Sequence, residues 1–291
     1  MVIDILVSGI AVGSIYSLIA MAYSLVFRST GYLNMAQGEM VMLGSLFGYT
    51  LLVMMGFNYY ISLLITMVII GVLGLLTDRL VFVPIQRRGG QELHILIAGI
   101  GLLIMLPQVA GLIWGTKTLS YPNTISQGQI AFGDIRISGL NFLIIVIAFI
   151  IMIALQSFFR FTRVGQAMRA IADDRVMSQL VGINIMKYIT LIFVVSGALT
   201  GAAGALFGPV YFASYDIGKI GIIGFAAAVL GGFGSVTGAM IGGILIGLIE
   251  GFSGTFISST YRDLILYAIL ILVLLLRPQG LFGVKQRRDA A

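Results

Sequence analysis

The chain is dominated by apolar runs of about 20 residues, the length that a helix needs to cross the hydrocarbon core of a bilayer. Only 10% of its residues are charged, against roughly 25% in an ordinary soluble domain. The segment at 217–233 is short and glycine-rich, so a full span, a re-entrant helix and one arm of a broken hairpin all stay open. Candidate spans lie at residues 4–27, 33–54, 59–83, 94–114, 140–159, 188–208, 217–233, 237–252 and 262–277. The sequence therefore predicts an all-α polytopic membrane protein, a bundle of about eight or nine membrane segments in a single domain over residues 1–291.

The lysines and arginines are distributed unequally between the two ends of these spans. Of the 17 basic residues, one side is assigned only four, namely Lys117, Arg136, Lys219 and Arg262. Basic residues are enriched in cytoplasmic loops, so the other side is predicted to be cytoplasmic. This places the N-terminus outside and the C-terminus inside. The formal net charge of +6 follows from that topology, and nucleic-acid binding is not expected.

Two segments between the spans are polar. The external loop at 115–139 alternates polar and apolar residues and has two interpretations, a small hairpin or a plain connector. The inner loop at 160–187 has apolar residues at helical spacing among charges of both signs, which predicts a short amphipathic helix that ends at Gly182. This helix either rests on lipid or inserts Val164, Met168 and Ile171 into a groove of a cytoplasmic partner.

The sequence lacks the residues that a catalytic or nucleotide-binding site requires. It has no cysteine and one histidine, His94, so no metal cluster or thiolate chemistry is expected, nor any cofactor or enzymatic activity. No Gly-x-x-x-x-Gly-Lys-Ser/Thr occurs, and Gly218-Lys219 is followed by Ile220 on the predicted outer side. The energy for any transport must come from another chain or from an ion gradient.

Three polar residues, Asn34, Gln37 and Glu39, interrupt the second apolar run. Asn34 is predicted to cap a helix start, with Gln37 reaching back as in a capping box, although a role in a transport path stays open for both. A charge at the bilayer centre is unfavourable by about 2.5–3.5 kcal/mol, so Glu39 should face protein or water. Glu39 is the stronger functional candidate, either as a hydrogen-bond partner between helices or as part of a gate. Glu250 is either a second path candidate or a residue at the outer boundary.

Glycines recur at four-residue spacing, the pattern that lets membrane helices approach closely. The Gly231–Ser235 stretch predicts irregular backbone, which is tolerated at membrane depth only where protein or water satisfies it. A weak internal echo joins "SGIAVG" and "SGALTG", each followed by a tract of small residues, as in a repeat-built transport domain with its path between the halves. The predicted packing glycines are Gly9 and Gly13, Gly44 and Gly48, Gly197 and Gly201, and Gly243, Gly247 and Gly251.

Four motifs in order, "LNMAQGEM", "RVGQAMRAIADDRVMSQLVGIN", "AAAVLGGFGSVTGAMIGGILIGLIE" and "RPQGLFG", resemble the permeases of branched-chain amino acid (LIV-type) ABC importers. The resemblance covers nearly the whole chain. It departs from the family at Met35, at Thr237 and at Lys219, which lies several residues earlier than the lysine usually found before "AAAVLGG".

The resemblance implies a multi-pass protein of the bacterial inner membrane. Its implied partners are a second permease subunit, two cytoplasmic ATPase subunits and an external solute-binding protein. Residues 163–184 match the permease loop whose short helix sits in a groove of the ATPase. The residues implicated in this coupling are Arg163, Gly165, Met168, Arg169, Ala170, Asp173, Asp174 and Gly182.

Several functions compete at this point. The favoured one is an ABC importer permease that carries branched-chain or other hydrophobic amino acids. A permease for urea or short amides in a similar importer is one alternative. An ion-coupled secondary transporter that uses Glu39 or Glu250 is another.

Overall fold

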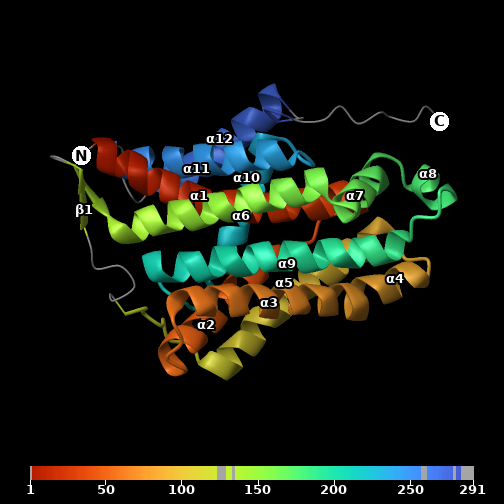
Figure 1. The fold of residues 1–291 in the computed structure, drawn as a ribbon, viewed down its shortest axis with the longest axis horizontal. Coiled ribbons are helices and arrows are strands. Elements are labelled where there is room, and N and C mark those ends of the chain that lie inside the picture. The colour runs from red at the N-terminus through yellow and green to blue at the C-terminus, as the bar shows by residue number, and fades with distance from the viewer. Residues whose placement is uncertain (1, 123–128, 133–134, 257–260, 278–279, 283–291) are drawn as a thin grey trace.

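A computed structural model describes residues 2–122, 129–132, 135–256, 261–277 and 280–282. The described chain is helical apart from one short hairpin, and most helices lie along one common direction (Figure 1). The elements are α1 (Val2–Thr30), α2 (Gln37–Tyr49), α3 (Tyr59–Thr77), α4 (Val83–Arg87), α5 (Glu92–Trp114), β1 (Gln129–Phe132), β2 (Ile135–Ser138), α6 (Gly139–Phe161), α7 (Arg163–Asp173), α8 (Arg175–Leu180), α9 (Ile185–Val210), α10 (Ile220–Gly231), α11 (Val236–Phe256) and α12 (Arg262–Leu276). Two π-helical segments, η1 (Thr50–Met54) and η2 (Asp78–Phe82), continue α2 and α3, and a 3-10 turn, η4 (Ile217–Lys219), precedes α10.

Six helical segments among the described residues are long and apolar enough to cross a membrane. They are α1, the continuous stretch Tyr59–Arg87, α5, α6, α9 and α11, and two shorter apolar helices lie at Ile217–Gly231 and Leu264–Leu276. The chain is therefore a polytopic membrane protein, as the apolar runs predicted. The second predicted span differs, because its helix begins at Gln37 and residues 31–36 are irregular.

Helices α1 and α9 form the centre of the bundle. They are far more enclosed than α5 and α6, whose exposed sides carry large aliphatic residues. The glycine seams explain how other helices approach them. Along α1, a Cβ at Gly13 would lie 2.8 Å from the Cα of Ile244 on α11. Along α9, a Cβ at Gly44 of α2 would lie 2.8 Å from the carbonyl oxygen of Gly201. The predicted packing role of these glycines is confirmed there.

The other predicted glycines extend the same seams. Gly9 and Gly247 pack against each other between α1 and α11, and Gly243 packs against Ser17. Gly197 packs against the α3 backbone, and Gly48 packs against Ala205 and Tyr121. At Gly251 the fit is looser, since an added Cβ would make ordinary contacts of 3.4–3.5 Å with α1.

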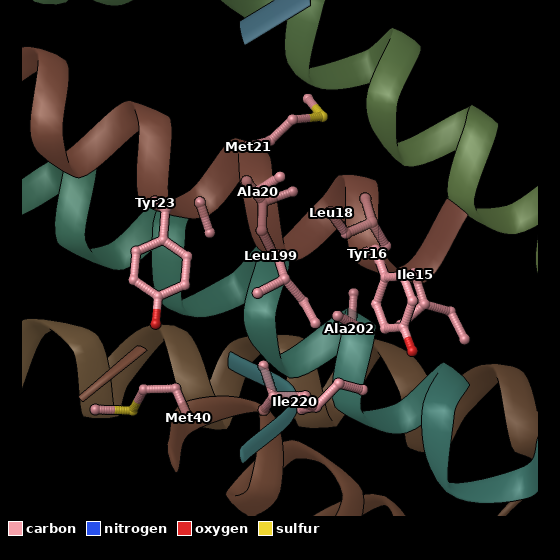
Figure 2. Close-up of a cluster of buried hydrophobic side chains, with 14 of the residues drawn as sticks. Ile15, Tyr16, Leu18, Ala20, Met21, Tyr23, Met40, Leu199, Ala202 and Ile220 are labelled. Atoms are coloured by element: carbon pink, nitrogen blue, oxygen red, sulfur yellow. The ribbon is translucent and has the colours of Figure 1, made fainter. Parts of the chain in front are cut away.

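Two short helices, α2 and α10, begin in the middle of the bundle. The side chain of Gln37, the first residue of α2, bonds Ser196, which is the twelfth of the 26 residues of α9. The start of α10 packs on the start of α2, where Gly38 contacts both Gly218 and Gly221. From there α2 runs parallel to α9. Helix α10 instead runs toward Phe27, which lies near the end of α1. Figure 2 shows Tyr23, Met40 and Ile220 gathered from α1, α2 and the start of α10.

The chain thus contains two similar units of opposite direction. In one, α1 is followed by irregular residues 31–36 and then α2. In the other, α9 is followed by irregular residues 211–216, η4 and then α10. These are the two stretches joined by the weak sequence echo. We call residues 31–36 the first return segment and residues 211–216 the second return segment, since each leads the chain back into the bundle.

Of the alternatives left open for 217–233, the structure shows one arm of a broken hairpin with α11. Helix α10 has 12 residues and rises about 18 Å, which is short of the ~30 Å hydrocarbon core. It turns directly into α11 through Gly232 and Gly234, whose φ angles of 107° and 83° suit only glycine.

The polar loops lie at opposite ends of the bundle (Figure 1). At one end, β1 and β2 form an antiparallel pair with Gln129 opposite Ser138, so of the two interpretations of 115–139 the structure has the hairpin. Leu119 in the same loop bridges to Ala213 of the second return segment. At the other end lie α7 and α8. The predicted single helix is wrong here, because Asp174 in an extended conformation (φ −155°) ends α7 and caps α8.

Candidate functional site

The first return segment is held by a chain of hydrogen bonds between buried side chains. The Asn34 amide nitrogen donates to Gln37 Oε1 at 3.1 Å, and Gln37 Nε2 donates to Ser196 Oγ at 2.6 Å. Ser196 in turn donates to the carbonyl oxygen of Ala22. The network joins the return segment, α2, α9 and α1, and it satisfies polar groups that would be unfavourable in lipid.

The predicted capping box is not formed. The residue at the N-cap of α2 is Ala36, without a side-chain cap. Asn34 instead closes a turn before the helix, because its Oδ1 accepts from the Ala36 amide at 3.1 Å. Asn34 and Gln37 do bond each other, but through their side chains. Asn34 therefore shapes the irregular backbone that lets the helix begin three residues later.

Glu39 lies where α2 meets the start of α10. It occupies the first turn of α2 and is 6% exposed, and its carboxyl group lies directly over the Cα of Gly218. Its Oε2 atom is buried and accepts no hydrogen bond among the described residues. The structure thus brings Glu39 next to two helix N-termini, which carry partial positive charge. The predicted hydrogen bond between helices is not seen at Oε2, and contact with the glycine backbone takes its place.

The start of α10 makes this close approach possible. A Cβ at Gly218 would overlap the Glu39 carboxyl group, and a Cβ at Gly221 would overlap Gly38 and lie 3.2 Å from the Tyr23 hydroxyl. Lys219 stands between these buried glycines and is exposed. Its predicted position on the outer side is wrong, because the start of the candidate span at 217–233 was taken to lie at the outer boundary of the membrane. Lys219 lies at the level of α2's first turn.

Glu250 is remote from this junction. It is 4% exposed, on α11, and the Tyr211 hydroxyl donates to its Oε1 at 3.4 Å. Tyr211 ends α9 and begins the second return segment. The four path candidates are therefore not one cluster. Asn34, Gln37 and Glu39 lie together, whereas Glu250 is near the end of the bundle where α9 ends.

Helix α7 is packed onto its own chain. Gly165 is buried against the backbone of Phe158 and Phe159, and Met168 and Ile171 are each 1% exposed. The prediction that the apolar side of α7 enters a partner's groove is wrong, because the end of the membrane bundle already covers that side. Polar contacts fasten α7 and α8 to the end of α1. Arg28 pairs with Asp173 of α7 at 3.1 Å, and the guanidinium of Arg175, the first residue of α8, donates to the Ser29 carbonyl.

Helix α8 presents the apolar surface that α7 hides. An apolar surface is formed by three exposed residues of α8 and the residue that follows it, namely Val176, Met177, Leu180 and Val181, each at least 62% exposed. Asp174 caps α8 by accepting from the Met177 amide at 2.9 Å. Gly182 ends the helix with φ 84°, as predicted. We refer to these four side chains as the α8 face. Arg163, Arg169 and Ala170, the other predicted coupling residues, lie on α7; the first two are exposed and Ala170 is partly so.

The sequence analysis missed Asp78. This carboxylate is fully buried in η2, where Thr190 of α9 donates to its Oδ2 at 2.6 Å. The signal was available, since "TDR" interrupts the apolar run at 59–83, and π-helical turns often mark functional positions. Asp78 was instead assigned to the basic end of the candidate span at 59–83, because Arg79 follows it.

Comparison with known proteins identifies the family of this bundle. The family model described as branched-chain amino acid transport system / permease component matches residues 5–274. The chain is 38% identical to the high-affinity branched-chain amino acid transport system permease protein BraD of Pseudomonas aeruginosa, over 96% of this chain and 94% of that protein. It is 36% identical to LivH of Escherichia coli K12, over 95% and 94%. It is 29% identical to the probable LivH of Methanocaldococcus jannaschii, over 98% and 93%.

No solved structure matches the chain significantly. The family match covers most of the chain, and the relatives are aligned over nearly their whole length. The chain belongs to the family of permease components of branched-chain amino acid transport systems.

Proposed function

We propose that the chain is the transmembrane permease subunit of an ABC importer for branched-chain or other hydrophobic amino acids. The observation that carries the proposal is the similarity, over nearly the whole chain, to BraD and LivH, which are named as permease proteins of such transport systems. A second permease subunit completes the path, two ATPase subunits supply the energy, and an external binding protein delivers the solute. The lack of a phosphate-binding motif supports a separate ATPase.

We propose the bacterial inner membrane as its location, with the hairpin end outside and the α7–α8 end in the cytoplasm. The bias of basic residues toward the latter end supports this orientation. In this topology, residues 31–54 and 211–231 each cross the membrane as an irregular half followed by a helical half. The chain then crosses nine times in all, which brings the N-terminus outside and the C-terminus inside.

The α8 face is the proposed docking site for the ATPase. The four exposed apolar side chains of the α8 face are unfavourable in water, and a groove in a partner would bury them. The Arg28–Asp173 and Arg175–Ser29 contacts tie α7 and α8 to the end of α1, immediately before the first return segment. A displacement of α8 would therefore be transmitted to residues 31–36 and to Glu39, the proposed gate element.

The docking proposal is tested by charge substitutions on the α8 face. Leu180→Glu and Val176→Glu should leave the melting temperature of the permease in detergent unchanged but release the ATPase subunits on co-purification. Gln166→Glu, at an exposed position of α7, is the matched control and should retain them. Met168→Asp should lower the melting temperature, because Met168 is buried in its own chain. Retention of the ATPases by well-folded Leu180→Glu protein would reject α8 as the docking element.

The function is tested with the assembled importer in proteoliposomes. Leucine uptake should require ATP and the loaded binding protein, should exceed uptake of urea or acetamide, and should persist without an ion gradient. The permease subunit alone should hydrolyse no ATP. The orphaned Oε2 of Glu39 favours an ion-coupled transporter as the second candidate. Uptake driven by a proton gradient in the absence of ATPase subunits would establish that candidate instead.

A further inference from the structure

Lys219 is an exposed lysine at half the depth of the bundle. Helix α10 extends about 18 Å from this point to Gly231, at the end of the bundle where α1 ends. The 29 residues of α1 span about 43 Å, so Lys219 lies near the middle of that length. The contact of its neighbour Gly218 with Glu39, in the first turn of α2, gives the same level independently.

The surface around Lys219 cannot face lipid without a substantial cost. An ammonium group at the bilayer centre is disfavoured by about 2.5–3.5 kcal/mol. Its four-carbon stem is short against half of the ~30 Å hydrocarbon core, so the group cannot reach the interface. Among the residues that the structure describes, no carboxylate lies within ion-pairing distance of it. The side chain therefore needs water or another protein group around it.

We propose that Lys219 faces the translocation path and binds the carboxylate of the amino acid in transit. This proposal deepens the proposed function and rests on it. The N-terminus of α10 lies at the same point and adds partial positive charge, which favours an anion there. A single exposed cation suits a brief contact, as a path must bind its solute weakly enough to release it.

Substitutions in the assembled importer test the role of the charge. Lys219→Met should reduce leucine transport at least about tenfold, the loss expected for one charge-assisted hydrogen bond. ATP hydrolysis stimulated by the loaded binding protein should continue, and Lys219→Arg should keep most transport. Lys117→Met, at an exposed lysine in the loop before the hairpin, is the matched control and should transport normally.

A cysteine at this position provides a readout that does not depend on lost activity. The chain contains no cysteine, so Lys219→Cys is the only labelling site in this subunit. It should react with water-soluble methanethiosulfonates, and leucine supplied with the binding protein should slow the reaction. The aminoethyl reagent restores a cation and should restore transport, whereas the sulfonatoethyl reagent should not. Leu112→Cys, 87% exposed on α5, should not react with either reagent.

The alternatives give different results. If Lys219 pairs with an acidic residue of the second permease, Lys219→Met should dissociate the two subunits on gel filtration, which would overturn the proposal. Normal transport by Lys219→Met, or an unreactive Lys219→Cys, would overturn it as well. If the wild-type importer takes up no amino acid, the proposed function itself fails, whatever the behaviour of the Lys219 variants.

Discussion

The two return segments perform the same task with different chemistry. Residues 31–36 lead α2 into the middle of the bundle through side-chain hydrogen bonds among Asn34, Gln37 and Ser196. The second return segment instead leads into η4 and α10, where Gly218 and Gly221 have no side chain and can therefore lie directly against Gly38 and Glu39. The first device tolerates small shifts, since hydrogen bonds can be remade, whereas the second requires near-contact of two backbones. We infer that the contact between α2 and α10 is the rigid joint and the first return segment the adjustable one.

The two return segments also differ in the part of the protein to which each is attached. The first is tied to α7 through Arg28 and to α8 through Ser29, at the α7–α8 end of the bundle. The second is tied to the opposite end, where Ala213 bridges to Leu119. One joint in the middle is thus connected to both ends of the molecule. Physical contact alone does not establish coupling, so the following predictions treat the two segments separately.

The largest loss of stability is expected from a substitution at the rigid joint between α2 and α10. Gly221→Ala would drive a Cβ into the backbone of Gly38, and overpacking of this kind costs about 3 kcal/mol or more when backbone must move. We expect a strongly lowered melting temperature in detergent and loss of assembly. Gly101→Ala on α5, where nothing lies within 4 Å, is the control and should melt at the wild-type temperature or above. A stable Gly221→Ala protein would show that the joint is not rigid.

A smaller effect is expected from Glu39 itself. Glu39→Ala removes a buried carboxyl group from the joint and should destabilise the bundle by about 2 kcal/mol through the cavity left behind. Glu39→Gln has nearly the same shape and should keep both stability and transport. Uptake assays in proteoliposomes across the pH range separate packing from chemistry. Abolished transport in a stable Glu39→Gln protein, together with a lost pH dependence, would assign Glu39 to proton coupling.

Substitutions in the hydrogen-bonded first return segment should reduce the stability of the bundle less. Gln37→Leu removes the side-chain bonds to Asn34 and Ser196 and should cost between about 1 and 2 kcal/mol, since one hydrogen bond has a usual net value of about 1 kcal/mol. A double-mutant cycle with Ser196→Ala measures the pair directly, because neighbours in one network are not additive. A coupling energy near zero in thermal unfolding would mean that the Gln37–Ser196 bond does not hold the segment.

The smallest effect on stability is expected at the α7 contact. The Arg28–Asp173 pair is partly exposed to solvent, and such pairs contribute about 1 kcal/mol or less. Arg28→Gln should therefore leave the melting temperature almost unchanged. If the pair transmits the motion of α8, the same variant should reduce leucine transport per ATP hydrolysed. Unchanged transport and unchanged stability together would remove this contact from the proposed connection.

Much of this architecture could be predicted from the sequence, because hydropathy reports directly on the length of an apolar helix. The spans, the hairpin, the glycine seams and the turn at Gly231–Ser235 all follow from local pattern. The burial of Met168 and Ile171 does not, since periodicity defines the apolar face of α7 but not which surface covers it. The depth of Lys219 could not be predicted either. The candidate span at 217–233 starts two residues before Lys219, which suggests a position near the outer surface, and only the contacts of Gly218 with α2 show that it lies in the middle of the bundle.

The central claim is that the two return segments enter the bundle from opposite sides of the membrane. The natural lack of cysteine allows a direct measurement with single cysteines at Leu33 and Asp216, labelled by a membrane-impermeant maleimide in right-side-out and inside-out vesicles. We predict that Leu33→Cys reacts only from the cytoplasmic side and Asp216→Cys only from the external side. Reaction of both positions from the same side would contradict the inverted arrangement of α1–α2 and α9–α10 and, with it, the proposed path between them.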